Sequence, residues 1–348
     1  MFTARYLLIG VLCVLVDLAY ANDPPHVKHE SISNIRSPRQ RALRETIRNT
    51  KRPRNNLVQG LFQSNKPYKQ NYLSILQNTP AYGPSEQRWR PLFSYENRNH
   101  PALQSLRKAY DLDNAAGAGS EISQIIRLMN WAHKVIPYDG NRSVPAQRNA
   151  QNLIELSKKN KAGYDCRGLA TILNEAYLAM GFESRLLSCF PKDTADREHH
   201  VITMVFSKTL GKWLWMDPSN NAYVTDEAGT LLGPDEVRNR LVKDQPVVIN
   251  KDANLNNKPI TDKQYLYDYM TKNLYWFQTP LHSGFNSETP QVNKSVNYVA
   301  LFPTGFTPYG SADIRLTTGT AYMTTSSNYF WQKPKGEISL PKRSKTKR

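Results

Sequence analysis

The sequence predicts an α+β fold in which a cysteine-bearing helix packs against an antiparallel sheet. An apolar pattern of helical period follows Cys166 and stops at Gly181. Two β-rich runs, at 200–206 and 212–218, are separated by a short turn that contains glycine, which is typical of a hairpin. Residues 90–330 are long enough to bury an ordinary core, so the fold does not need a disulfide framework.

Cys166 is predicted to lie in the first turn of its helix. The stretch from Asp165 onward leads into apolar residues at helical spacing, namely Leu169, Ala170, Leu173, Ala176, Tyr177 and Met180. Gly181 suits the position just after a helix. Free N–H groups and the positive end of the helix dipole favour a thiolate in the first turn, and the thiolate is the nucleophilic form of cysteine. Cys166 is therefore the candidate nucleophile.

The predicted hairpin brings a histidine close to a carboxylate. If its turn is centred near Thr209, facing residues have numbers that sum to about 418, so His200 and Asp217 lie opposite each other or nearly so. Directly paired Cβ atoms are roughly 5 Å apart. A carboxylate there can accept the imidazole N–H and stabilise the imidazolium. The alternative is that Asp217 only ends a strand before Pro218.

His199 is the rival of His200 for the role of base. The alternation of Ile202, Met204 and Phe206 places His200, and not His199, in phase with the inward face of the strand. Adjacent histidines point to opposite faces of a strand and make a poor metal pair. The sequence also contains no Gly-rich phosphate loop and no cysteine pair spaced for zinc, so we predict neither a cofactor nor a metal.

These three motifs resemble those of the transglutaminase-like superfamily, a papain-like thiol fold. The cysteine helix and its continuation Met180-Gly181-Phe182-Glu183-Ser184-Arg185, the strand that begins at His200, and the strand that ends at Asp217-Pro218 match the family in order over about residues 120–240. The sequence departs where Tyr164-Asp165 separates Gly163 from Cys166, and where Ile202 and Met204 replace the usual Trp and Glu. The resemblance implies a Cys-His-Asp site with Cys166 as nucleophile, His200 as base and Asp217 as its orienting carboxylate.

Two cysteines follow the N-terminal apolar segment, Cys166 and Cys189. A disulfide between them would block the nucleophile, and this alternative stays open from the sequence. Trp131 lies upstream of Cys166, where the family resemblance allows a role in binding the oxyanion. Packing within its helix is the more ordinary role for this residue.

Further elements are predicted on both sides of these motifs. Helices are expected at 102–110, at 120–135 and from Pro234 to about Val242, and a second hairpin at 220–224 and 230–232. A cluster of aromatic residues indicates more packed structure toward the C-terminus, namely Tyr265, Tyr267, Tyr269, Tyr275, Trp276 and Phe277. Core packing is the default role of this cluster, and the lining of a peptide or glycan groove is its alternative.

The positive charge lies at the ends of the chain. The formal net charge is +17, and residues 22–70 contain 11 Lys or Arg against 3 acidic residues, while residues 333–348 contain 7 against 1. These segments lack an interleaved aromatic platform or a reading motif for bases, which argues against nucleic acid as the partner. A solvated tail is the commonest role of such segments, and an anionic surface is the partner that they would suit.

The N-terminus has the pattern of a secretory signal. Arg5 is followed by an apolar run and by the small-x-small site Ala19-Tyr20-Ala21, a run too short for a spanning helix. We therefore predict a signal peptide at 1–21, a basic and largely disordered extension at 22–90, a transglutaminase-like domain with a C-terminal extension at 91–332, and a basic tail at 333–348. The chain is expected to be secreted, with no transmembrane span after removal of the signal.

Together these features predict a secreted thiol enzyme that acts on amide bonds of a peptide or protein substrate. Hydrolysis of the acyl-enzyme is favoured over crosslinking. The alternative from another class is an inactive module that keeps the fold in order to bind peptide or glycan.

Overall fold

The computed structural model describes residues 71–334, except 87, 292–293 and 311. Its centre is a sheet whose strands follow the order β12-β13-β11-β9-β2-β3-β4-β5-β6. All neighbouring pairs in this sheet are antiparallel except β11 with β13, which are parallel. The strands are β2 (Ser184–Phe190), β3 (His200–Ser207), β4 (Lys212–Asp217), β5 (Ala222–Thr225), β6 (Val248–Ile249), β9 (Trp276–Pro280), β11 (Tyr298–Leu301), β12 (Ile314–Leu316) and β13 (Gly319–Thr324).

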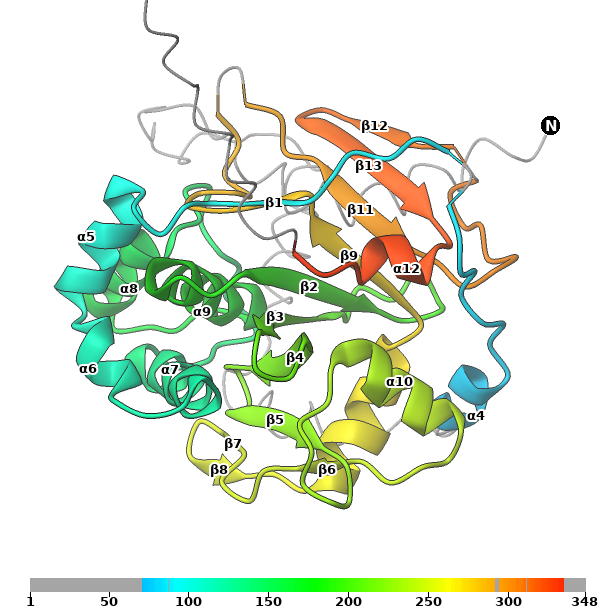
Figure 1. Cartoon of the computed structure of the whole chain (residues 1–348), viewed down its shortest axis with the longest axis horizontal. Coiled ribbons are helices and arrows are strands. Elements are labelled where there is room, and N and C mark those ends of the chain that lie inside the picture. Colours follow the sequence, from blue (N-terminus) through cyan, green and yellow to red (C-terminus); the bar gives the residue numbers. More distant parts are fainter. Residues whose placement is uncertain (1–70, 87, 292–293, 311, 335–348) are drawn as a thin grey trace, which may run out of the picture. The chain divides into compact units, whose positions relative to one another are not determined.

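One face of the sheet is covered by a layer of helices. Figure 1 shows α5 to α9 gathered beside β2 and β3. Val205, Leu214 and Met216 belong to the buried cluster that these helices build with the sheet. The helices are α5 (Pro101–Ala109), α6 (Leu112–Ala116), α7 (Glu121–Val135), α8 (Ala150–Asn160) and α9 (Cys166–Met180).

The other face is covered by shorter helices. Met204, Trp213 and Trp215 belong to a second buried cluster, whose remaining members come largely from these helices and from neighbouring strands. The alternation of strand side chains thus separates two cores. The elements of this layer are α4 (Tyr72–Gln77), α10 (Pro234–Val242), the π-helix η1 (Lys263–Met270), α11 (Thr271–Asn273) and α12 (Ser327–Phe330).

The predicted elements around Cys166 and the hairpins are confirmed. Helix α9 begins at Cys166 after the N-cap Asp165, and it ends at Gly181, which has a positive φ of 89°. Strands β3 and β4 pair as an antiparallel hairpin. The second predicted hairpin forms with a bridge between Thr225 and Leu231, and α10 spans the helix expected to end at Val242.

The packed structure begins before the predicted boundary at residue 91. Leu76 of α4 is fully buried, and the backbone carbonyl of Gly83 accepts a hydrogen bond from the N–H of Ser327 at 2.8 Å. Arg90 pairs with Asp313 at 2.7 Å. Residues 71–90 therefore pack against C-terminal parts of the chain, whereas the predicted signal peptide, residues 22–70 and residues 335–348 lie outside the described residues.

The predicted C-terminal extension is an integral part of the sheet. Strand β9 pairs with β2, and β11, β13 and β12 continue the sheet outward from β9. Two short pairs complete the described strands: β1 (Ser94–Tyr95) with β10 (His282–Ser283), and β7 (Asn254–Leu255) with β8 (Lys258–Pro259). In the part of the chain that the structure describes, no helix is both long and apolar enough to cross a membrane.

Candidate active site

Cys166 is the first residue of α9 and is 9% exposed. The side chain of Asp165 caps the helix, because its carboxylate accepts a hydrogen bond from the N–H of Gly168 at 3.2 Å. Just before the helix, Gly163 approaches Pro137 so closely that a Cβ on it would lie 2.0 Å from the Pro137 carbonyl oxygen. Only glycine fits at this position. The close contact holds the loop after α7 against the start of the cysteine helix.

His200 and Asp217 form a buried pair on the hairpin. His200 Nε2 lies 2.7 Å from Asp217 Oδ2, and the two residues are 1% and 0% exposed. The strands pair with Thr203 opposite Met216. The numbers of directly paired residues therefore sum to 419 rather than to about 418. Asp217 is thus not directly opposite His200 but is its diagonal neighbour on the same face of the sheet.

The face that carries this pair is the one turned away from α9. His200 shares it with Ile202, Met204 and Phe206, as predicted, but the cluster of these three side chains lies on the η1 side of the sheet. Val201 lies with Cys166 in a cluster on the α9 side. His200 is the first residue of β3, and its side chain is still close enough to Cys166 for that residue to contribute to the raised pKa of His200.

The electrostatics of the pair favour an imidazolium. Burial alone would lower the pKa of His200, but the charge and hydrogen bond of Asp217, together with Cys166, outweigh it and raise this pKa to about 10. Burial would likewise raise the pKa of Asp217, but the charge of His200 and hydrogen bonds from His200, Tyr265 and Asn220 lower it. An imidazolium held by a carboxylate is the partner that a nucleophilic cysteine needs.

Asp217 accepts hydrogen bonds on both carboxylate oxygens. Oδ1 accepts from the backbone N–H groups of Ser219 at 2.9 Å and Asn220 at 3.3 Å. Oδ2 accepts from the Asn220 amide at 2.9 Å and from the Tyr265 hydroxyl at 2.7 Å, in addition to His200. These bonds fix the carboxylate, and through it the orientation of the imidazole.

Two tyrosines of η1 were not identified from the sequence as site residues. Tyr265 donates to Asp217 and accepts a hydrogen bond from Trp215 Nε1 at 3.0 Å. The hydroxyl of Tyr269 lies 3.2 Å from His200 Nδ1. The two tyrosines are four residues apart, so they lie on one face of a helix. This spacing is the sequence signal that could have linked them to each other. Nothing local to them indicates the partner on the hairpin.

Tyr138 flanks the thiol from the loop after α7. Its ring packs against the small cluster that contains Cys166. Asn256 holds its backbone on both sides, accepting from the Tyr138 N–H at 3.0 Å and donating to its carbonyl at 2.9 Å. Burial and then the charge of Cys166 raise the pKa of the Tyr138 hydroxyl, which keeps it a hydrogen-bond donor. A Cβ atom at residue 140 would lie only 2.8 Å from the Tyr138 hydroxyl, so the glycine at this position leaves room for that hydroxyl.

The remaining candidates from the sequence lie outside this arrangement. His199 is half-buried, and its ring stacks on Phe190 at 4.9 Å between centroids. Trp131 packs edge-on against Tyr110 at 6.1 Å, as a helix-packing residue does. Cys166 and Cys189 are both free thiols, so the structure contains no disulfide between them. Over the described ranges, no group of three or more His, Cys, Asp or Glu side chains could hold a metal ion.

The fold is of the α+β, transglutaminase-like and papain-like type that the sequence motifs predicted. Residues 108–218 match the sequence model of the Transglutaminase-like superfamily, and this range contains Cys166, His200 and Asp217. A search among curated proteins finds none that matches the chain.

Several solved structures of proteases resemble the chain at low identity. A protein from Cytophaga hutchinsonii described as a cysteine protease is 14% identical over 49% of this chain and 49% of its own, with a TM-score of 0.28. Legionella pneumophila LapG is 15% identical over 40% of this chain and 80% of its own, also with a TM-score of 0.28. A Parabacteroides distasonis protein described as a protease is 16% identical over 42% and 36%, with a TM-score of 0.23. The chain thus matches about half the length of the first of these proteins.

Proposed function

We propose that this protein is a thiol-dependent acyl-transfer enzyme that acts on amide bonds of peptides or proteins. The observation that carries the proposal is the position of His200, which lies 2.7 Å from a buried Asp217 carboxylate and close enough to Cys166 to interact with it electrostatically. A nucleophile, a base and a group that orients the base are the minimum that this chemistry requires.

The reaction follows from these positions. The Cys166 thiolate attacks the amide carbonyl carbon, and the His200 imidazolium then gives its proton to the leaving amine as the C–N bond breaks. Asp217 keeps Nε2 occupied, so Nδ1, which also lies 3.2 Å from the Tyr269 hydroxyl, is the nitrogen that exchanges a proton with sulfur, amine and water. Water attacks the thioester after His200 has taken one of its protons, and the thiolate leaves.

The oxyanion needs at least two hydrogen-bond donors. The N–H of Cys166 lies in the first turn of α9, where helical N–H groups have no partner within the helix. We assign the second donor to the hydroxyl of Tyr138, because its ring packs on the Cys166 cluster and its loop is fixed by Asn256. Tyr138→Phe should lower kcat by about 10²- to 10³-fold with little change in KM. The matched control Tyr223→Phe, on β5, should leave both constants unchanged.

Water is the acceptor that we favour for the acyl-enzyme. Water needs no binding site of its own, whereas crosslinking requires a second site that holds an amine in place against competing hydrolysis. The proposal includes secretion, which the signal-like pattern at residues 1–21 supports.

Incubation with a peptide library followed by mass spectrometry tests the reaction. Cleaved peptides would show a peptidase, conversion of glutamine to glutamate an amidase, and joined peptides a transamidase. Cys166→Ala should abolish every product while leaving the melting temperature close to that of the wild type, and Cys189→Ala should keep most of the activity. If no product forms, and Cys166 reacts with iodoacetamide no faster than a thiol in a short peptide, the protein is the inactive binding module.

A further inference from the structure

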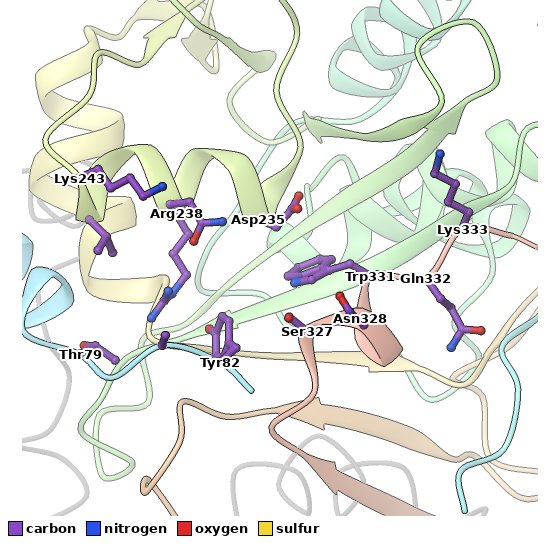
Figure 2. A pocket seen from close by; sticks show the side chains of 13 residues that line it. Thr79, Tyr82, Asp235, Arg238, Lys243, Ser327, Asn328, Trp331, Gln332 and Lys333 are labelled. Carbon is purple, nitrogen blue, oxygen red and sulfur yellow. The ribbon is translucent and has the colours of Figure 1, made fainter. Parts of the chain in front are cut away.

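A pocket with a volume of about 530 Å³ lies between α10, the segment after α4 and the chain around α12. This size is typical of small-molecule sites. Figure 2 shows its labelled side chains coming from these three segments. None of the residues that line it belongs to the candidate active site. They are Thr79, Ala81, Tyr82, Asp235, Arg238, Asn239, Val242, Lys243, Ser327, Asn328, Trp331, Gln332 and Lys333.

Arg238 is the feature of this pocket that points to a ligand. It is 3% exposed, and its Nε donates to the carbonyl of Leu274 at 2.9 Å. Its guanidinium lies over the ring of Tyr82, with 4.3 Å from the central carbon to the ring centroid. Its Nη2 has no hydrogen-bond acceptor among the described residues. Figure 2 shows the guanidinium reaching from α10 toward Tyr82 and Thr79. Arg238 is thus a buried cation at the wall of the pocket, and an anionic ligand beside it would offset part of the cost of burying its charge.

The charges around Arg238 favour an anion of modest size. Lys243 is exposed and lies five residues after Arg238, just beyond the end of α10. Lys333 also lines the pocket, but its ammonium lies beside Gly211 at the β3–β4 turn. Asp235 is the single acidic residue among the lining residues. Arg238 and Lys243 are therefore the cations available to a bound carboxylate, and Asp235 opposes it.

The rest of the lining suits a ligand rich in hydroxyl groups. Trp331 is half-buried and rests edge-on against Phe330 and Phe277, with ring centroids 4.6 and 5.3 Å away. Carboxamides and hydroxyls surround it, from Asn239, Asn328, Gln332, Ser327 and Thr79. Aliphatic side chains are few, namely Ala81 and Val242. A sugar ring can lie on an indole face while its hydroxyls bond to amides, whereas an aliphatic peptide side chain would find little apolar surface here.

We propose that this pocket binds an acidic saccharide, with the carboxylate of a uronic acid near Arg238 and Lys243 and a sugar ring against Trp331. The site lies on elements that contribute no residue to the triad, so it serves to hold the enzyme on an acidic glycan and takes no part in the chemistry. The inference stands apart from the proposed acyl transfer, and it is tested by binding rather than by turnover.

The test is isothermal titration calorimetry of the full chain with trigalacturonic acid, with cellotriose as the uncharged control. Working at 0.15 M salt, where the Debye length is about 8 Å, limits binding by the basic ends of the chain. The acid should bind and the neutral sugar should bind at least tenfold more weakly. Lys243→Ala should weaken binding of the acid about three- to tenfold, whereas Asp235→Asn should strengthen it. Lys258→Ala, an exposed lysine of β8, is the matched control and should change nothing.

Opposite responses of the Lys243 and Asp235 variants identify the pocket, because neither residue lies in the basic ends. Trp331→Ala should reduce binding at least tenfold, with its melting temperature measured alongside. If that variant unfolds, the Lys243 and Asp235 pair still decides the matter. Equal binding of the neutral sugar, equal effects of Lys243→Ala and Lys258→Ala, or tighter binding of an acidic peptide than of trigalacturonic acid would each overturn the proposal.

Discussion

Replacement of Asp217 by asparagine tests the candidate site more sharply than replacement of the cysteine, because the carboxylate accepts hydrogen bonds on both oxygens. An asparagine must place its NH₂ group at one of these two positions. At Oδ1 the NH₂ would face the backbone N–H groups of Ser219 and Asn220. At Oδ2 it would face His200, the Asn220 amide and the Tyr265 hydroxyl. Every orientation therefore sets donor against donor.

The cost follows from removing one member of a buried ion pair. Such a removal lowers the free energy of unfolding by about 3–5 kcal/mol. In a domain of this size, this corresponds to a fall in melting temperature on the order of 10 °C. The imidazolium of His200 would lose its main stabilising charge, and turnover should fall on the order of 10⁴-fold, as when the carboxylate of a Ser-His-Asp triad becomes an amide.

Two measurements check this without a known substrate. Thermal unfolding reports the stability, and the rate of iodoacetamide modification of Cys166 at pH 7 reports the state of the thiol, which should react at least tenfold more slowly in Asp217→Asn. The control is Asp226→Asn in the turn after β5, where asparagine can accept the same local bonds. Its melting temperature should stay close to that of the wild type. Wild-type reactivity of Cys166 in Asp217→Asn would refute the assigned roles.

Three further predictions concern the base, the pH and the ends of the chain. His200→Ala should lower turnover about 10²- to 10⁴-fold, and His199→Ala far less; equal losses would mean that the wrong face of β3 had been assigned. Because the pKa of His200 rises from its ordinary 6.5 to about 10 on folding, its contribution to stability should be complete below pH 6.5 and lost as the pH rises through about 10. Urea unfolding at stepped pH should show this decline, and His200→Gln should flatten it. Deletion of residues 22–70 and 335–348 should leave turnover of a small peptide unchanged and weaken retention on an anionic matrix, and retention of the intact chain should fall steeply with salt; retention that ignores salt would exclude an electrostatic anchor.

The parts of the fold that the sequence predicted are those with local patterns. A helix start, a C-terminal glycine and a short hairpin turn all act within a few residues, so α9 and the β3–β4 hairpin could be placed almost to the residue. The pairing of His200 with Asp217 followed from the hairpin alone. The exact register of the hairpin did not follow from the sequence. A turn of four residues allows the two strands to shift by one residue, and the alternation of side chains does not show which register forms.

The parts that could not be predicted depend on contacts between distant segments. Strand β9 enters the sheet beside β2, although it lies well beyond the segment that resembles the family. Residues 71–90 look polar in sequence, yet Leu76 is buried because helices formed far downstream, among them α10 and α11, pack against α4. The two η1 tyrosines carry a helical spacing but no mark of their partners, since contacts across this distance leave no periodic signal in one sequence.

Tyr265 shows how far the site depends on that distant layer. Its hydroxyl donates to Asp217 and accepts from the indole of Trp215, so it joins η1 to β4 at the carboxylate. Tyr265→Phe removes one bond from Asp217 and leaves a buried indole N–H without its acceptor, which should lower the free energy of unfolding by about 1–3 kcal/mol. The half-buried Tyr267 of the same helix provides the matched control, and Tyr267→Phe should cost less than about 0.5 kcal/mol. If Tyr265 acts through the carboxylate, Tyr265→Phe should hardly change the rate of Cys166 alkylation in an Asp217→Asn background. The hydrogen bond from Tyr265 to the carboxylate is already lost in that background. Full additivity of the two variants would show instead that Tyr265 only packs the core and does not position the candidate site.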